Sequence, residues 1–100
     1  MILPAALAVL AVVAPGPAQV TIVDDAFRPR TLTVSRGRAV TWRWLGRRRH
    51  DVWFAEGPAR CRPRRSGTCT RRFARAGRYE YFCTLHGSMA AVVRVRRRVP

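Results

Sequence analysis

From residue 19 onward, side chains that could be buried recur at every second position, mostly with polar or charged side chains between them, and this pattern is the feature that most constrains the fold. The inward positions would be Val20 and Ile22; Leu32 and Val34; Val40, Trp42 and Trp44; His50, Val52 and Phe54; Tyr79, Tyr81 and Cys83; and Met89, Ala91, Val93 and Val95. Successive side chains of a strand point to opposite faces, so each run predicts a strand with one buried face. Turn-forming dipeptides such as Arg36-Gly37 and Ala76-Gly77 separate the runs. Several short strands without a long helix are typical of a β-sandwich or β-barrel.

The chain has 100 residues, with 20 arginines, no lysine and five acidic residues, which gives a net charge of +15. This length fits one small domain and excludes a multidomain enzyme, a two-part nucleotide-binding fold and a polytopic membrane protein. Extreme charge is also typical of disordered chains, but 48% of the residues are hydrophobic, so a packed core is possible.

Residues 1–18 contain no charged side chain and end in prolines, a glycine and Ala18. A short apolar run that ends in small residues predicts a secretory signal peptide, cleaved after Ala18. An uncleaved N-terminal anchor is the second interpretation, and a buried helix of a cytosolic domain is the third. The first two place a domain of residues 19–100 outside the cytoplasm, in the periplasm, at the cell surface or in the extracellular space, where disulfides persist.

Cys61 and Cys69 lie eight residues apart in a stretch rich in proline, glycine, serine and arginine. We expect a loop closed by a disulfide, which would also hold together arginines that repel one another. Free thiols or metal ligands are the alternative, although no histidine or carboxylate lies between the two cysteines.

The remaining cysteine lies in a run where Cys83, His86 and Met89 recur every third residue between two predicted strands. A thiolate, an imidazole and a thioether form a soft ligand set that selects copper, and the other histidine, His50, is the candidate fourth ligand. Two histidines and a cysteine with a weak axial methionine are the blue-copper arrangement. Four protein ligands leave no position for a substrate, which favours electron transfer over catalysis. A purely structural role for Cys83 and His86 is the alternative.

The segment Cys83–Met89 resembles the copper loop of the cupredoxins, the plastocyanin and amicyanin group, in its short form. The resemblance extends to the segments Asp25–Val34, Gly37–Trp42, His50–Val52 and Gly77–Cys83. It implies a Greek-key β-sandwich of about seven to eight strands. It also implies one copper ion on His50, Cys83, His86 and Met89 that cycles between Cu(I) and Cu(II).

The position after the first histidine departs from the family, because Asp51 stands where asparagine is usual. We expect Asp51 to bind Thr84, which follows Cys83, and a carboxylate requires donors there that an amide supplies itself. Such contacts orient ligands and tune the reduction potential.

Arginines cluster at residues Arg47–Arg49, Arg60–Arg65, Arg71–Arg75 and Arg94–Arg98. They form either a solvated surface or a docking surface for an acidic redox partner or an anionic membrane, with Leu85, His86, Arg47, Arg48 and Arg49 nearest the metal. We expect no nucleic-acid binding, because Trp42 and Trp44 would point into the core rather than stack on bases.

The sequence thus predicts an exported, monomeric one-electron carrier that is not an enzyme. Copper storage or delivery through the same residues is the alternative.

Overall fold

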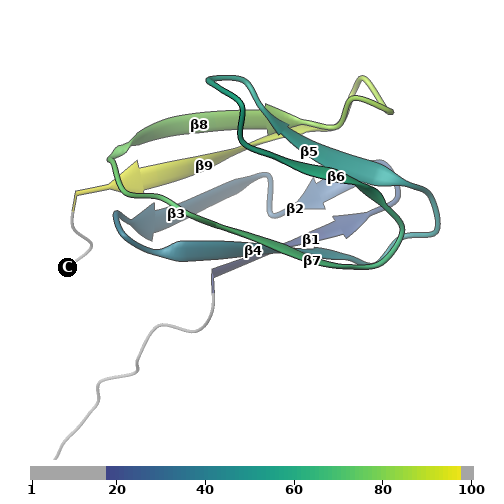
Figure 1. The fold of residues 1–100 in the computed structure, drawn as a ribbon, viewed down its shortest axis with the longest axis horizontal. Helices are drawn as coiled ribbons and strands as arrows, with labels where there is room; N and C mark the ends of the chain where they lie inside the picture. The colour runs from purple at the N-terminus through teal and green to yellow at the C-terminus, as the bar shows by residue number, and fades with distance from the viewer. Residues whose placement is uncertain (1–17, 98–100) are drawn as a thin grey trace, which may run out of the picture.

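In a computed structural model, residues 18–97 are described, and within this range nine strands and no helix occur. The strands are β1 (Ala18–Val23), β2 (Ala26–Arg28), β3 (Thr31–Ser35), β4 (Ala39–Trp44), β5 (His50–Phe54), β6 (Arg60–Arg64), β7 (Gly67–Arg72), β8 (Gly77–Phe82) and β9 (Ala90–Arg96). They form a sheet ordered β2-β1-β4-β7 and a second sheet ordered β3-β9-β8-β5-β6. Figure 1 shows the two layers packed face to face, so the predicted all-β sandwich is confirmed.

Two of the strand pairs are parallel, β1 with β4 and β3 with β9, and the others are antiparallel. The predicted alternation is confirmed by burial. Val20, Ile22, Val40 and Trp42 are fully inaccessible. The Trp42 ring lies 5.5 Å from Phe54 and 5.4 Å from Tyr81 (centroid to centroid), both edge-on, which is the geometry aromatic pairs prefer.

The expected loop around Cys61 and Cys69 is instead two strands, β6 and β7, joined by a turn. The disulfide itself is confirmed, and it joins strands that belong to different sheets, because β6 is the edge of one sheet and β7 the edge of the other. Hydrophobic alternation did not reveal these strands, because Cys61 and Cys69 are their only apolar side chains apart from Pro63, and the other positions are arginine, threonine and glycine. The Cys61–Cys69 bond therefore closes one open side of the sandwich.

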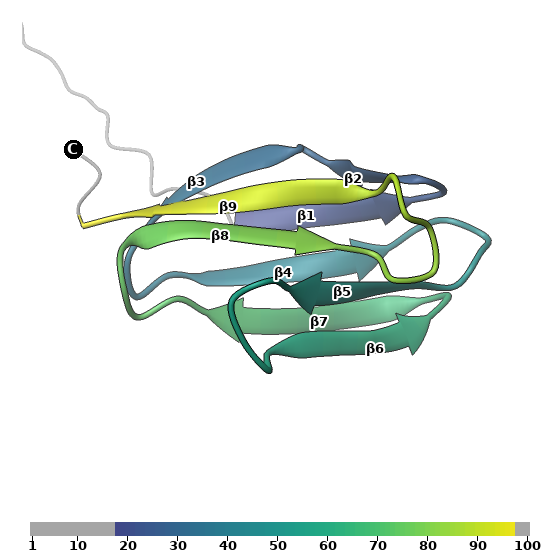
Figure 2. The ribbon, with the colours of Figure 1, turned by 90° about the horizontal axis from the view of Figure 1, so that it is seen from above.

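Three loops meet at one end of the sandwich, the right-hand end in Figure 2. They are the turn at residues 24–25 between β1 and β2, the loop at 45–49 between β4 and β5, and the loop at 83–89 between β8 and β9. This end therefore collects all four predicted metal ligands.

The predicted signal peptide falls almost entirely on residues 1–17, which lie outside the described residues. Strand β1 begins at Ala18, one residue before the predicted domain boundary. Residues 18–97 contain no helix that is both long enough and apolar enough to cross a membrane.

Candidate metal centre

His50 and Cys83 come together from two neighbouring strands. His50 is the first residue of β5, and Cys83 directly follows β8, its partner in the sheet. Both side chains are buried, and Cys83 Sγ lies 3.9 Å from His50 Nδ1. The pairing of β5 with β8 thus brings a thiol and an imidazole nitrogen, 33 residues apart in sequence, to one point.

The loop that follows Cys83 is closed by its own backbone. The Cys83 N–H donates to the Met89 carbonyl, and the Met89 N–H donates to the His86 carbonyl, both at 3.0 Å. This closure buries Met89 and leaves the His86 side chain 24% exposed at the surface. The two imidazole rings are 4.8 Å apart between centroids.

The His86 ring thus lies beside His50, and it also approaches the neighbouring turn. Its Nδ1 lies 3.8 Å from the Asp25 carboxylate, at the tip of the β1–β2 turn. Within residues 18–97, no three histidine, cysteine, aspartate or glutamate side chains already form a group that could hold a metal ion.

The donor set nevertheless fits copper in chemical type, because a buried thiol and an imidazole already face each other beside a thioether-bearing loop. Burial raises the pKa of the Cys83 thiol, and the backbone N–H groups of Asp51 and Leu85 oppose this by favouring the thiolate. Metal binding at this point would therefore displace a proton from sulfur.

Asp24, in the β1–β2 turn, organises the neighbouring loop. Its carboxylate accepts backbone N–H groups from Arg47 at 2.9 and 3.1 Å and from Arg48 at 2.9 Å. It also lies 3.1 Å from His50 Nε2. The Arg48 N–H, the His50 ring and the Arg47 N–H, in that order, lower the pKa of Asp24 to about 2. The carboxylate is thus ionised and can only accept a hydrogen bond, so the Nε2–H group donates to Asp24 and Nδ1 is the ring nitrogen that faces Cys83.

Two further residues fix this arrangement. The Trp44 indole N–H donates to the His50 carbonyl at 2.8 Å, in the core. Gly46 packs directly on Asp24, where a Cβ would lie 2.8 Å from the Asp24 backbone nitrogen. A larger residue at position 46 would therefore push the loop off the carboxylate.

The expected contact between Asp51 and Thr84 is present. The Thr84 N–H donates to Asp51 Oδ1 at 2.7 Å, and the Thr84 hydroxyl donates to Oδ2 at 2.5 Å. Thr84 thus supplies both donors that a carboxylate needs. The pair ties the residue after His50 to the residue after Cys83, which holds the two candidate ligands at a fixed separation.

Sequence reasoning missed Asp24, Trp44 and Gly46. Asp24 is 26 residues from His50, Trp44 binds the backbone of His50 from the other sheet, and Gly46 acts only by leaving room for Asp24, so no spacing rule predicts these contacts. One signal was available for Asp24, because an acidic turn residue between two strands is uncommon in a chain with only five carboxylates.

The residues predicted to dock a partner surround this end. Leu85 is exposed beside His86, and so is Leu45, which begins the β4–β5 loop. The Arg48 side chain pairs with Asp25 at 3.6 Å on the surface, so part of the positive charge of Arg47–Arg49 is offset locally.

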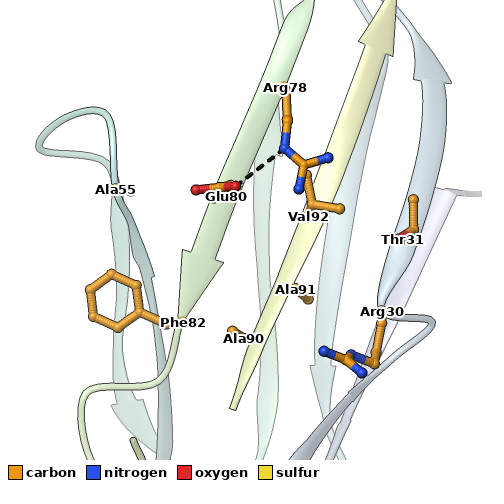
Figure 3. A pocket seen from close by; sticks show the side chains of 9 residues that line it. All are labelled: Arg30, Thr31, Ala55, Arg78, Glu80, Phe82, Ala90, Ala91 and Val92. Carbon is orange, nitrogen blue, oxygen red and sulfur yellow. Dashed lines mark hydrogen bonds and ion pairs between the residues drawn. The ribbon is translucent and has the colours of Figure 1, made fainter. Parts of the chain in front are cut away.

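A separate hollow of about 490 Å³ lies on the outer face of β8 and β9 (Figure 3). Figure 3 shows Phe82 at the lower left, Arg30 at the lower right, and Arg78 bound to Glu80 above them. Its lining contains no histidine, cysteine or methionine, so it is not a copper site.

No protein-family model and no curated protein matches the chain. Among solved structures, an oxidised point mutant of amicyanin is 30% identical, with a TM-score of 0.71, and the match covers 84% of this chain and 86% of that one. A purple cupredoxin from Nitrosopumilus maritimus is 20% identical over 78% of this chain and 98% of that one, with a TM-score of 0.72.

A copper-containing nitrite reductase from Thermus scotoductus is 23% identical with a TM-score of 0.70, and the match covers 90% of this chain but only 25% of the reductase. The purple cupredoxin and the reductase support the fold alone. The amicyanin match spans most of both chains, and the two-sheet sandwich and the His50–Cys83 pair agree with it. The chain therefore belongs to the cupredoxin family.

Proposed function

We propose that the protein binds one copper ion through His50, Cys83, His86 and Met89 and carries single electrons between redox partners. The observation that carries this proposal is the 3.9 Å approach of Cys83 Sγ to His50 Nδ1, buried beneath the loop at 83–89 of a cupredoxin sandwich. Similarity to amicyanin supports a copper electron-transfer role of this kind.

Copper at this point would supply a one-electron couple between Cu(I) and Cu(II). The protein's own contribution is rigidity. Asp24 fixes the His50 ring, Trp44 fixes its backbone, and Asp51 ties the strand of His50 to that of Cys83. Ligands held this firmly move little when the charge at the centre changes, which keeps the barrier to electron transfer low. Burial of Cys83 and Met89 excludes water and substrate, which fits a carrier rather than an enzyme.

The route to a partner is the partly exposed His86, with Leu85 and Leu45 as apolar neighbours. The net charge of +15 favours an acidic redox partner, which electrostatic attraction would bring to the surface faster at low salt. An anionic membrane surface is the alternative partner. We expect the protein to be a monomer, as the sequence analysis predicts.

We also propose that the protein is exported. The Cys61–Cys69 disulfide supports this, because such bonds persist in the periplasm and outside cells and are rare in the reducing cytosol.

Copper binding is tested by adding Cu(II) to the purified protein. We expect an intense visible band from thiolate-to-copper charge transfer, which Cys83→Ser abolishes and Met89→Leu shifts. Arg94→Gln, an exposed change on β9 away from the candidate ligands, is the matched control and leaves the band unchanged. A wild-type protein that stays colourless, or a Cys83→Ser variant with the same band, refutes the proposed centre.

Carrier and delivery roles are separated by two rates. Fast electron self-exchange, measured by NMR line broadening in mixtures of the two oxidation states, supports the carrier. Rapid loss of Cu(I) to a chelator such as bicinchoninate, with slow self-exchange, supports storage or delivery and would overturn the carrier role.

A further inference from the structure

All five carboxylates of the chain are already engaged. Asp24 holds the β4–β5 loop, and Asp51 accepts from Thr84. The others form ion pairs: Asp25 with Arg48, Glu56 with Arg71, and Glu80 with Arg78. No internal acid is left to neutralise the remaining arginines.

Three arginines without an ion pair in the described part of the chain wall one pocket. These residues, Arg49, Arg60 and Arg62, line a hollow of about 560 Å³ on the side of β5 and β6. Trp53 completes the wall, and the Arg60 guanidinium lies over its ring, 4.8 Å from the centroid. Stacking of this kind holds a guanidinium flat and leaves its edge free to donate. We call this hollow the basic pocket.

The basic pocket contains one carboxylate, and that carboxylate is already satisfied. Asp51 is only 4% exposed, and each of its oxygens accepts a hydrogen bond from Thr84. The buried carboxylate therefore offsets at most one of the three guanidinium groups that line the hollow.

We propose that the basic pocket binds an oxyanion, either a free phosphate-type ion or the carboxylates of an acidic peptide segment. Guanidinium groups present paired N–H donors that match two oxygens of a carboxylate or phosphate, and charge-assisted bonds of this type are the strong ones. A bound oxyanion would give the three neighbouring positive charges an external counter-ion, because the buried Asp51 carboxylate can offset at most one of them.

The pocket also borders the candidate metal centre. Arg49 and Asp51 flank His50 in sequence, and Thr84 follows Cys83. An anion bound there would favour the more positive oxidation state of a metal on those ligands. This consequence rests on the proposed function, whereas the anion site itself does not.

The test therefore uses metal-free protein, titrated with inorganic phosphate at low ionic strength and followed by NMR at the Trp53 indole and the Thr84 amide. We expect saturable shifts at both. Arg60→Gln/Arg62→Gln should weaken binding by about tenfold or more, because each lost charge-assisted bond is worth about that factor. Arg94→Gln/Arg96→Gln, which removes the same charge from β9, should change binding by less than about threefold, as expected for exposed, screened charges.

A second variant separates shape from charge. Arg62→Lys keeps the charge but loses the paired donors, so its affinity should fall between those of the parent and the glutamine double variant. Folding of every variant is verified from the dispersion of the same spectra.

A parallel titration with hexaglutamate identifies the source of the oxyanion. Saturation by phosphate supports a free-ion site, and saturation by hexaglutamate alone supports the carboxylates of a peptide. Linear, non-saturating shifts with both probes overturn the proposal, and so do equal losses in the pocket variant and the β9 variant. Because copper is absent, failure here leaves the metal centre intact, and a colourless protein with saturable phosphate binding would refute only the metal centre.

Discussion

Two basic segments of the protein are held in opposite ways. In Arg47–Arg49, the backbone N–H groups of Arg47 and Arg48 donate to Asp24, and the Arg48 side chain pairs with Asp25. In Arg60–Arg65, no side chain pairs with a carboxylate within residues 18–97. That second segment is held by the Cys61–Cys69 disulfide, which links it to the opposite sheet.

The difference shows which positions require one of the few carboxylates of this chain. A carboxylate accepts hydrogen bonds in defined directions, so Asp24 can set both the path of the 45–49 loop and the orientation of the His50 ring. An edge strand has no such requirement and needs only to be kept in place against the repulsion of its own arginines. A covalent bond does this without regard to charge.

Removing the disulfide should produce the largest effect. Cys61→Ser/Cys69→Ser should lower the free energy of unfolding by about 2–3 kcal/mol, since the bond closes a short loop in the unfolded chain. Urea denaturation measures the loss. Amide exchange should rise first in β6 and β7, and the 45–49 loop should stay protected. A double variant as stable as the parent would show that contacts other than the covalent bond hold the basic edge.

Asp24→Asn should loosen the other segment with an effect next in size. The amide presents an NH₂ group where the carboxylate accepted N–H donors, so the Arg47 and Arg48 amides should exchange faster and the His50 ring should lose its fixed orientation. Copper affinity, measured by competition with a chelator, should fall about tenfold or more, as is usual for partners of metal ligands.

The pH dependence of stability sharpens this prediction. The native-state pKa of Asp24 is lowered from 3.8 to about 2. Its contribution is therefore complete above pH 3.8 and is lost as the pH falls through about 2. Asn does not titrate, so the variant should show a smaller loss of stability across that acid range. Identical acid denaturation curves would contradict the role assigned to Asp24.

The sequence predicted the strands whose faces differ in polarity, and it predicted two pairs of site residues that lie close together. Val20, Ile22, Val40 and Trp42 alternate with polar residues, and burial follows this alternation. The approach of His50 to Cys83, and the contact of Asp51 with Thr84, follow from a motif at the ends of two adjacent strands. The ligand roles of His50, Cys83, His86 and Met89 stay predictions.

What the sequence could not predict depends on distance along the chain and on local charge. In β6 the arginines alternate only with Cys61 and Pro63, and in β7 Cys69 is the one apolar side chain, so hydrophobic alternation is hidden. The contact of Asp24 with His50 spans 26 residues and belongs to no motif. The basic pocket arises because β5 and β6 pair, which places Trp53 opposite Arg60.

The smallest expected effects come from changing a single exposed charge in either of the two segments. Arg62→Glu places a carboxylate on the edge that has none, and it should raise the free energy of unfolding by about 0.5 kcal/mol at low salt, as exposed ion pairs do. Arg62→Gln is the control that removes repulsion without adding attraction, and it should gain less. Arg48→Gln removes the surface pair with Asp25 and should cost a similar small amount. Since these charges are exposed, added salt should shrink all three differences; a gain for Arg62→Glu that persists at high salt would mean that the edge is limited by packing rather than by repulsion among its arginines.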